Sequence, residues 1–293
     1  MKKLLFIINP MAGRQQAQTD LYKMVKIFAD HDYEVTVYPT RARLDCTRKV
    51  LEDAGRFDLV VCCGGDGTLK EMVSGMMQRQ DRRPMGYIPL GSTNDLAVSL
   101  RLPTRVEEAA LRAVTGNEFH MDVGTLNDRY FNYIAAFGAF TETSYATPQE
   151  IKNALGHLAY ILEGVKSLGK ILPIHVKITA DDEQFEEDYL FGAVTNTISL
   201  GGVLKLDPEK VLLDDGMYEL LLVKNPTNAL EAQAMLTAIM TQNFDGPLVK
   251  MFHASDIPFE SSHEISWTID GEYGGIFSHT HILNNKNAVT LIV

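Results

Sequence analysis

The first 125 residues alternate short apolar runs with longer stretches in which apolar residues recur at helical spacing. The apolar runs predict strands at Leu4–Ile8, Glu34–Tyr38, Asp58–Cys63 and Met85–Leu90. The stretches between them predict helices at Ala17–His31, Asp45–Ala54 and Thr68–Gln78. Strands that alternate with helices are typical of a mostly parallel sheet covered by helices on both faces. In such a sheet the ligand binds in the loops at the carboxyl ends of the strands.

The pattern changes after about residue 126. Apolar stretches that predict strands now follow one another with few helices between them: Arg129–Phe137, Ile174–Ala180, Tyr189–Ser199, Met217–Val223, Glu264–Ile269 and Ala288–Val293. Helices are expected at Pro148–Leu168 and Pro226–Thr241. Successive strands of this kind favour an antiparallel sandwich. We therefore predict an α/β domain over residues 1–125 and a β-rich sandwich domain over residues 126–293.

Composition supports two folded domains and restricts the partners. The chain has 293 residues, of which 45% are hydrophobic and 22% are charged, and this is ordinary for globular domains with real cores. The net charge of −11 is uneven, because residues 1–125 carry 17 basic and 16 acidic side chains, against 10 and 22 in residues 126–293. The acidic second half argues against nucleic acid as a partner, since phosphate binding needs a cationic surface.

The N-terminus and the cysteines both indicate a cytoplasmic protein. Lys2 and Lys3 precede an apolar run, but Asn9 and Pro10 end that run after five residues, which is too short for the core of a signal peptide, roughly 7–15 residues. No stretch approaches the roughly 20 apolar residues that span a bilayer. The three cysteines, Cys46, Cys62 and Cys63, show neither a zinc spacing nor a CxxC motif, and we expect buried, reduced thiols.

Three loops that follow predicted strands carry the candidate chemistry. They are NPMAG at residues 9–13, GGDGT at residues 64–68 and GSTND at residues 91–95, and the last two lead directly into helices. The glycines of GGDGT allow a ligand to approach the backbone, and the helix start turns free N–H groups toward it. Asp66 would repel a bare phosphate but would bind Mg²⁺ attached to one.

An isolated glycine loop with Asp66 as a helix N-cap would be a sufficient explanation of GGDGT alone. Three such loops at one sheet edge instead favour a site for a metal-bound nucleotide. The loop is neither a Walker A motif, because no GK[ST] follows, nor a Rossmann fingerprint.

The order and spacing of these motifs resemble those of the bacterial diacylglycerol kinase family, the soluble lipid kinases with a diacylglycerol kinase catalytic domain. The resemblance covers essentially the whole chain. GGDGT alone is also similar to loops of NAD kinases and phosphofructokinases, whereas its combination with NPxxG and G-[ST]-x-N-D-x-A is more specific to lipid kinases. The resemblance implies a nucleotide-binding domain of phosphofructokinase or NAD-kinase type over residues 1–125 and a lipid-binding sandwich over residues 126–293.

The resemblance also implies roles for individual residues. The residues expected to bind ATP are Asn9, Pro10, Met11, Ala12, Gly13, Thr40, Gly65, Asp66, Gly67, Thr68, Leu69, Lys70, Glu71 and Ser92. Asp66 would be catalytic through Mg²⁺. Family members usually have threonine at the position of Ser92, so this chain keeps the hydroxyl and lacks the methyl group.

Two further motifs lie in the second domain. IDGEYGG, residues 269–275, is by itself only a plausible β-turn, but the resemblance implies that Glu272 accepts the proton of the acceptor hydroxyl and that Asp270 supports the metal or the turn. LLDDGMYEL, residues 212–220, predicts a hairpin turn. Here the resemblance implies a structural Mg²⁺ held by Asp215 and the carbonyls of Leu212 and Met217.

We therefore predict an ATP-dependent lipid kinase that transfers the γ-phosphoryl group to a hydroxyl of diacylglycerol or a related lipid, with ATP and Mg²⁺ as cofactors. The protein would be cytoplasmic and peripheral at the inner membrane face, and an unpaired sandwich edge could support a homodimer. The alternatives are an NAD kinase-like enzyme and a catalytically silent regulator that binds nucleotide or lipid. The acceptor could also be another acylglycerol, a sphingoid base or a prenol.

Overall fold

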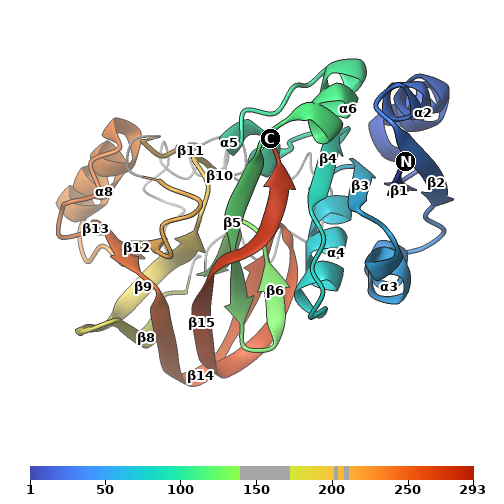
Figure 1. Ribbon diagram of the computed structural model, residues 1–293. Helices are drawn as coiled ribbons and strands as arrows, with labels where there is room; N and C mark the ends of the chain where they lie inside the picture. The colour runs from blue at the N-terminus through green and yellow to red at the C-terminus, as the bar shows by residue number, and fades with distance from the viewer. Residues whose placement is uncertain (139–171, 201–203, 208–210) are drawn as a thin grey trace. The chain divides into compact units, whose positions relative to one another are not determined.

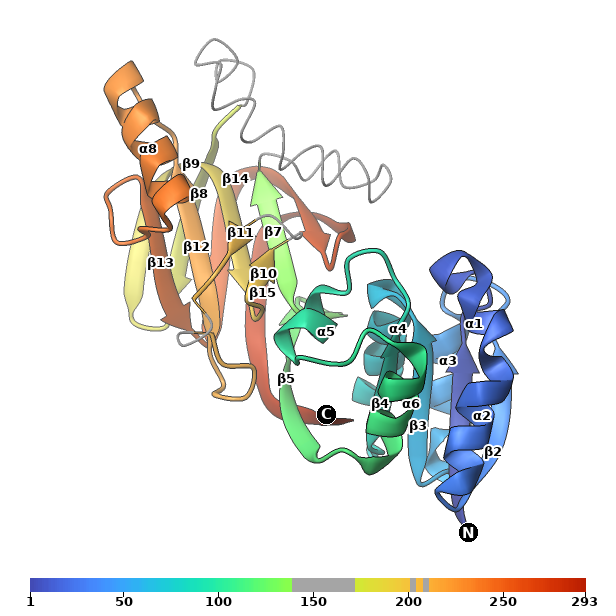
Figure 2. The same ribbon diagram turned by 90° about the horizontal axis from the view of Figure 1, so that it is seen from above.

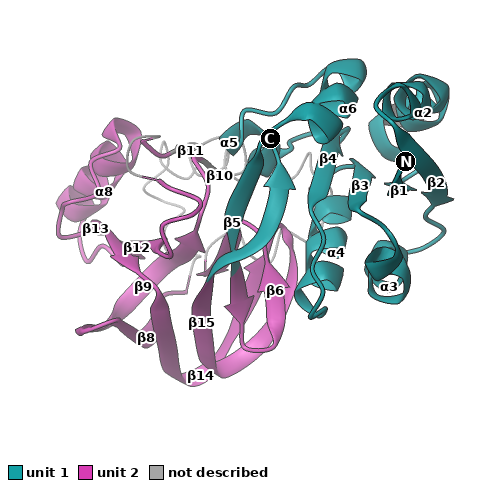
Figure 3. Ribbon diagram, in the orientation of Figure 1, with its two compact units in different colours: residues 1–123, 286–293 teal, residues 124–285 magenta. Residues whose placement is uncertain are grey.

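The computed structural model describes residues 1–138, 172–200, 204–207 and 211–293. The helix predicted at Pro148–Leu168 lies outside the described residues. The chain forms two compact units, unit 1 with residues 1–123 and 286–293, and unit 2 with residues 124–285 (Figure 3). The last eight residues, predicted within the second domain, thus fold with unit 1, because the final strand of the chain joins the sheet of that unit.

Unit 1 is built on a sheet with the strand order β2-β1-β3-β4 (Figure 1). Its strands are β1 (Lys2–Ile8), β2 (Tyr33–Pro39), β3 (Leu59–Gly64) and β4 (Met85–Pro89). Neighbouring strands in this order are parallel. Leu291, near the end of β15 (Glu272–Ile292), pairs with Met85 and extends the sheet beyond β4. Strands β3 and β4 are buried throughout, and β1 is buried from Leu4 onward, which explains their almost continuous apolar sequences.

Helices cover both faces of this sheet (Figure 2). They are η1 (Ala12–Gln15), α1 (Gln16–Thr19), α2 (Leu21–Asp30), α3 (Asp45–Asp53), η2 (Ala54–Arg56), α4 (Asp66–Met77), α5 (Asp95–Ser99) and α6 (Val106–Thr115). Helix α2 packs on α6, and α3 packs on α4. On the α2 and α6 face, Met24, Phe28 and Ala110 pack against Phe6 and Val61 in one buried cluster. This core fixes the ends of the strands, where the loops begin.

Unit 2 is an antiparallel β structure, which confirms the prediction for this half of the chain. Its elements are β5 (Glu118–Leu126), which begins in unit 1, β6 (Arg129–Phe131), β7 (Ile134–Gly138), β8 (Ile174–Ala180), β9 (Glu183–Thr195), β10 (Ser199–Leu200), β11 (Leu204–Lys205), β12 (Tyr218–Lys224), α8 (Ala229–Thr241), β13 (Val249–Ala254), β14 (Asp256–Ile269) and β15. Strand β7 lies between β9 and β14, and β12 lies between β9 and β13. The buried rings of Phe137, Phe259 and Trp267 contact one another in the core.

Several elements differ in extent from those predicted. The expected helix at 17–31 is divided at Asp20, where α1 has ended and α2 begins. The strands expected at 264–269 and 288–293 are the ends of the much longer β14 and β15. Helix α5 is the helix expected directly after GSTND, whereas α6, β5, β11 and β13 were not predicted. Within the described ranges, no helix has both the length and the apolar character that crossing a membrane requires.

Candidate active site

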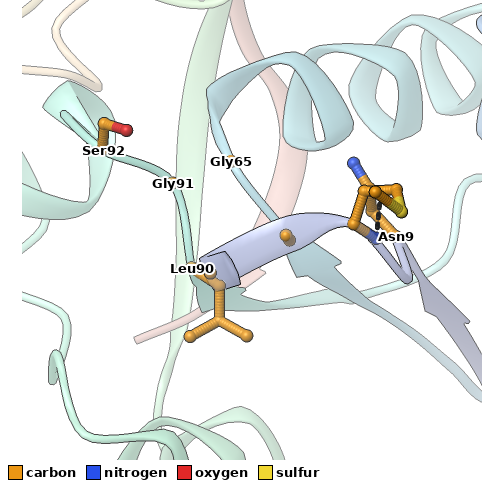
Figure 4. Close-up of a pocket in the computed structure, with 8 residues that line it drawn as sticks. Asn9, Gly65, Leu90, Gly91 and Ser92 are labelled. Carbon is orange, nitrogen blue, oxygen red and sulfur yellow. Dashed lines mark hydrogen bonds between the residues drawn. The ribbon is translucent and has the colours of Figure 1, made fainter. Parts of the chain in front are cut away.

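The loops that follow β1, β3 and β4 enclose a pocket in unit 1 with a volume of about 480 Å³ (Figure 4). It is lined by Asn9, Met11, Ala12, Gly13, Gly65, Leu90, Gly91 and Ser92. All of these residues follow the carboxyl ends of parallel strands, where ligands bind in sheets of this kind. The sequence predicted six of them as nucleotide-binding residues, and Leu90 and Gly91 were missed although GSTND was recognised as a motif.

The first loop is shaped by Asn9. Its backbone N–H donates to the carbonyl of Cys63 at 2.9 Å, and its side-chain Oδ1 accepts the N–H of Met11 at 3.0 Å. Its Nδ2 lies 3.5 Å from Oγ1 of Thr68. The side chain of Asn9 therefore turns the NPMAG loop and also reaches the first turn of α4.

The second and third loops touch through glycine backbones. A Cβ atom placed on Gly91 would lie 2.7 Å from the Cα of Gly65 and 2.5 Å from Oδ1 of Asn94. Such distances are too short for any side chain, so the approach of the two loops requires glycine. The N–H of Leu90 also donates to the carbonyl of Gly64 at 2.7 Å.

Asn94 organises the third loop and was not predicted as a site residue. Its Oδ1 accepts the N–H of Gly91 at 2.9 Å and the hydroxyl of Tyr87 at 3.2 Å, and its Nδ2 donates to the carbonyl of Gly91 at 2.9 Å. Its backbone is left-handed, with φ at +52°, a conformation that asparagine tolerates better than most residues. The asparagine within GSTND was the sequence signal for this role.

Asp66 is the first residue of α4, directly after Gly65 of the pocket. Its Oδ2 accepts the backbone N–H of Asn94 at 2.8 Å, so the carboxylate joins the loops after β3 and β4. Around the next residue, Gly67, a Cβ atom would meet nothing within 4 Å. The first turn of α4 is thus open to a ligand at Gly67, where N–H groups and the helix dipole favour negative charge.

The other residues expected to bind ATP lie outside the pocket lining: Pro10, Thr40, Asp66, Gly67, Thr68, Leu69, Lys70 and Glu71. Thr40 donates its N–H to the carbonyl of Ile8 at 2.9 Å, and Leu69 is completely buried. Glu71 has a structural role that the sequence did not reveal, because its carboxylate accepts the N–H groups of Leu44 at 2.8 Å and Cys46 at 3.1 Å. A contact of these residues with ATP stays a prediction.

The DGE segment of unit 2 is a tight hairpin turn. Asp270 and Gly271 have φ angles of +50° and +75°, and Ile269 pairs with Glu272 across the turn. Asp-Gly is a preferred sequence for such a two-residue turn with both φ angles positive. Glu272 is therefore the first residue of β15, and its side chain is half-buried.

The turn before β12 contains the residues expected to bind a structural metal. Oδ1 of Asp215 accepts the N–H of Met217 at 2.8 Å, and the carbonyl of Met217 accepts Nδ2 of Asn284 at 3.1 Å. Leu212 is exposed. No cluster of three or more His, Cys, Asp or Glu side chains suited to a metal occurs in the described part of the chain. The carbonyl and carboxylate oxygens nevertheless fit a hard cation, because each can accept more than one bond.

Glu219 lies close to this turn and is 1% exposed. Burial raises its pKa to about 8, and the charge of Asp215 acts in the same direction. A sequence signal for this buried acid existed but was missed: in β12 Glu219 shares a strand face with Leu221 and Val223, and both of these are buried.

Comparison with known proteins agrees with this architecture. Residues 3–126 match the diacylglycerol kinase catalytic domain, and residues 140–291 match the YegS C-terminal NAD kinase beta sandwich-like domain. A diacylglycerol kinase of Bacillus subtilis (strain 168) is 32% identical over 98% of this chain and 97% of the relative. A diacylglycerol kinase of Staphylococcus saprophyticus is 31% identical over 94% of this chain and 90% of the relative.

Solved structures from Bacillus anthracis str. Sterne share the fold. One has a TM-score of 0.84 at 28% identity and covers 99% of this chain and 97% of its own. The crystal structure of a diacylglycerol kinase from the same organism has a TM-score of 0.76 at 24% identity, over 99% and 96% of the two chains.

The glycine loops, the pocket and the β-rich second unit, together with these matches, define a two-domain kinase. The chain belongs to the diacylglycerol kinase family, as the sequence motifs predicted.

Proposed function

We propose that this protein is an ATP-dependent kinase that phosphorylates the free hydroxyl of diacylglycerol. The pocket of unit 1 carries the proposal, because three strand-end loops supply it with glycine backbone and Asp66 adjoins it at the start of α4. Relatives named diacylglycerol kinase align over nearly the whole chain, which supports diacylglycerol over other lipid alcohols.

Asp66 would hold Mg²⁺ in this site together with the phosphates of ATP. Oxygen ligands suit this hard cation, which normally keeps several waters and binds through one or two carboxylates and the substrate phosphates. Bound Mg²⁺ would neutralise charge on the phosphate oxygens. The backbone N–H groups at the start of α4, near the open position of Gly67, would orient the phosphates.

Glu272 would accept the proton of the lipid hydroxyl as its oxygen attacks the γ-phosphorus. A carboxylate in this role also orients the acceptor oxygen in line with the bond that breaks. The place of Glu272 beside a tight turn and at the start of β15 supports this role, because a residue on a rigid element can be held accurately.

The turn before β12 would hold a second, structural Mg²⁺ through Asp215 and the carbonyls of Leu212 and Met217. Membrane contact would be peripheral and at the cytoplasmic face, because the proposed acceptor is a membrane lipid. An open edge of the sheet in unit 2 would allow two copies of the protein to form a homodimer.

The direct test is transfer of ³²P from [γ-³²P]ATP to dioctanoylglycerol in mixed micelles, with NAD, a sphingoid base and a prenol as parallel acceptors. We expect labelled phosphatidic acid as the main product and a loss of turnover of at least about 100-fold in Glu272→Gln, the usual size of a general-base contribution. Labelled NADP instead of lipid would replace this proposal with the NAD kinase alternative. ATP binding without labelling of any acceptor would favour a silent regulator.

A further inference from the structure

Asp270 does more than form the turn in which it lies. The turn between β14 and β15 needs a residue that tolerates positive φ, and asparagine or glycine would serve as well as aspartate. Asp270 as a whole is 7% exposed, so it is withdrawn from water although it belongs to a hairpin end. Its oxygens should therefore accept hydrogen bonds from specific partners, since burying a carboxylate without partners is costly.

The carboxylate binds three consecutive backbone amides from a segment 136 to 138 residues earlier in the chain. Its Oδ2 accepts the N–H of Asn132 at 2.9 Å, and its Oδ1 accepts those of Tyr133 at 3.0 Å and Ile134 at 3.3 Å. The N–H of Asp270 also donates to the carbonyl of Ile134 at 2.9 Å. Hydrogen bonds to an ionised acceptor are about twice as strong as neutral ones, so this attachment is firm.

The same segment is held from its other side by the end of β9. The carbonyl of Tyr133 accepts the N–H of Asn196 and the hydroxyl of Thr195, both at 2.9 Å. Thr195 and Asn196 are completely buried. The segment 132–134 is therefore fixed between β9 and the hairpin turn, and the ends of three adjacent strands, β9, β7 and β14, are joined into one rigid edge.

We propose that Asp270 is the positioning residue for Glu272. By attaching the hairpin turn to the segment 132–134, its carboxylate fixes the backbone at the first residue of β15, and so the direction in which the Glu272 carboxylate leaves the sheet. Asp270 exchanges no proton in this role; the hydroxyl proton passes to Glu272. This inference rests on the proposed function of Glu272 as proton acceptor.

Two substitutions of Asp270 keep the hairpin turn but weaken or remove its hydrogen bonds to the segment 132–134. Asp270→Asn gives an Asn-Gly turn and keeps one acceptor oxygen, while Asp270→Gly keeps the positive φ and removes all three bonds. Because a misplacement of about 1 Å at a reacting group can cost about 100-fold, we expect kcat to fall about 10-fold in Asp270→Asn and about 100-fold in Asp270→Gly. The KM for ATP should stay within about twofold, since the pocket lies in unit 1.

Asp181 provides a matched control in the same unit. It also has a left-handed backbone, with φ at +48°, in the turn between β8 and β9. Its carboxylate accepts the N–H groups of Ser255 and Asp256, both at 3.1 Å. Asp181 is exposed, but Asp181→Gly likewise removes bonds to consecutive backbone amides, at a place far from Glu272 in the sequence. We expect it to lower Tm while leaving kcat within about twofold of the wild-type protein.

A double-mutant cycle distinguishes positioning from general destabilisation. If Asp270 acts through Glu272, Asp270→Gly should lower kcat no further in a Glu272→Gln background, because residues that act as a unit are not additive. An equal loss in both backgrounds, or wild-type kcat in Asp270→Gly, would overturn the inference and leave the lipid kinase assignment standing. Wild-type kcat in Glu272→Gln would instead reject the role of Glu272 and the inference with it. If Asp270→Gly does not fold by circular dichroism, the Asp270→Asn pair completes the same cycle.

Discussion

The backbone N–H of Asn94 donates to Oδ2 of Asp66 at 2.8 Å. One carboxylate thus connects the loop after β3 with the loop after β4, and the two loops also touch through Gly65 and Gly91. The side chain proposed to hold Mg²⁺ is therefore oriented by the protein before any nucleotide binds. Such orientation reduces the ordering that binding must otherwise bring about.

Two substitutions of Asn94 distinguish the effect of its left-handed backbone from the effect of its side-chain hydrogen bonds. Asn94→Gly keeps the left-handed φ and loses the bonds to Gly91 and Tyr87, whereas Asn94→Ala loses the bonds and also adopts an unfavourable φ. We expect Asn94→Ala to be less stable than Asn94→Gly by about 1–2 kcal/mol in urea unfolding, and both to bind ATP more weakly than the wild-type protein. Equal stabilities would show that the φ angle imposes no cost.

The contact between the glycine loops predicts opposite effects for two similar substitutions. Gly91→Ala places a methyl group 2.7 Å from the Cα of Gly65, whereas at Gly67 the same group meets open space. We expect Gly91→Ala to lower the free energy of unfolding by about 1–3 kcal/mol, as overpacking does. Gly67→Ala should leave it unchanged or raise it by up to about 1 kcal/mol, because alanine favours a helix. A destabilisation of similar size in both variants would argue against the observed contact.

The thiols should be unreactive in the folded protein at mildly alkaline pH. Cys46, Cys62 and Cys63 are completely buried. Burial raises the pKa of Cys63 to about 12 and raises the pKa values of Cys46 and Cys62 as well. These pKa values exceed that of an unfolded thiol, roughly 8.5, so the thiols of the folded state stay protonated to higher pH. The stability contributed by the neutral thiols is therefore lost as pH rises from about 9 toward 12.

Iodoacetamide labelling followed by mass spectrometry measures this protection. At pH 8.5 we expect little labelling of the native protein within the time that labels all three thiols in guanidinium chloride, since only the thiolate reacts. Rapid labelling of native Cys63 would contradict its burial.

The proposed structural metal can be tested without measuring activity. Mg²⁺ that binds only the folded state stabilises it by about 2.7 kcal/mol at 100 times its Kd, so the Tm of the wild-type protein should rise with MgCl₂ in the absence of nucleotide. Asp215→Asn should lose most of this rise. Asp214→Asn, a change of equal charge at an adjacent, exposed residue, should retain it. An undiminished rise in Asp215→Asn would remove the metal from this turn.

Those parts of the site that follow a local sequence pattern could be predicted. Short apolar runs located β1, β3 and β4, and the glycine motifs after them contributed six residues to the pocket. The importance of Asn94 could have been predicted, because it belongs to GSTND. A motif does not show, however, which of its side chains hydrogen-bonds to its own backbone. The β-turn at Asp270 was also visible, since Asp-Gly is a local signal.

Other features depend on contacts between distant residues and could not be predicted. The bonds of Asp270 to the segment 132–134, and of Glu71 to the start of α3, join residues that no sequence spacing connects. Strands β14 and β15 were underestimated because polar stretches such as 261–264 interrupt their apolar alternation. The break at Asp20 was missed because the apolar residues of α2 continue the spacing expected of a single helix.

The role of Asp66 is the central claim, and the initial rate of phosphatidic acid formation from dioctanoylglycerol and MgATP tests it most directly. We predict that Asp66→Asn, which keeps an acceptor oxygen for the N–H of Asn94, folds normally and loses at least about 100-fold in rate, the size of a lost electrostatic contribution. Glu52→Gln, a change of equal charge at an exposed residue of α3, should keep the wild-type rate. A folded Asp66→Asn protein that forms phosphatidic acid as fast as the wild type would contradict the account.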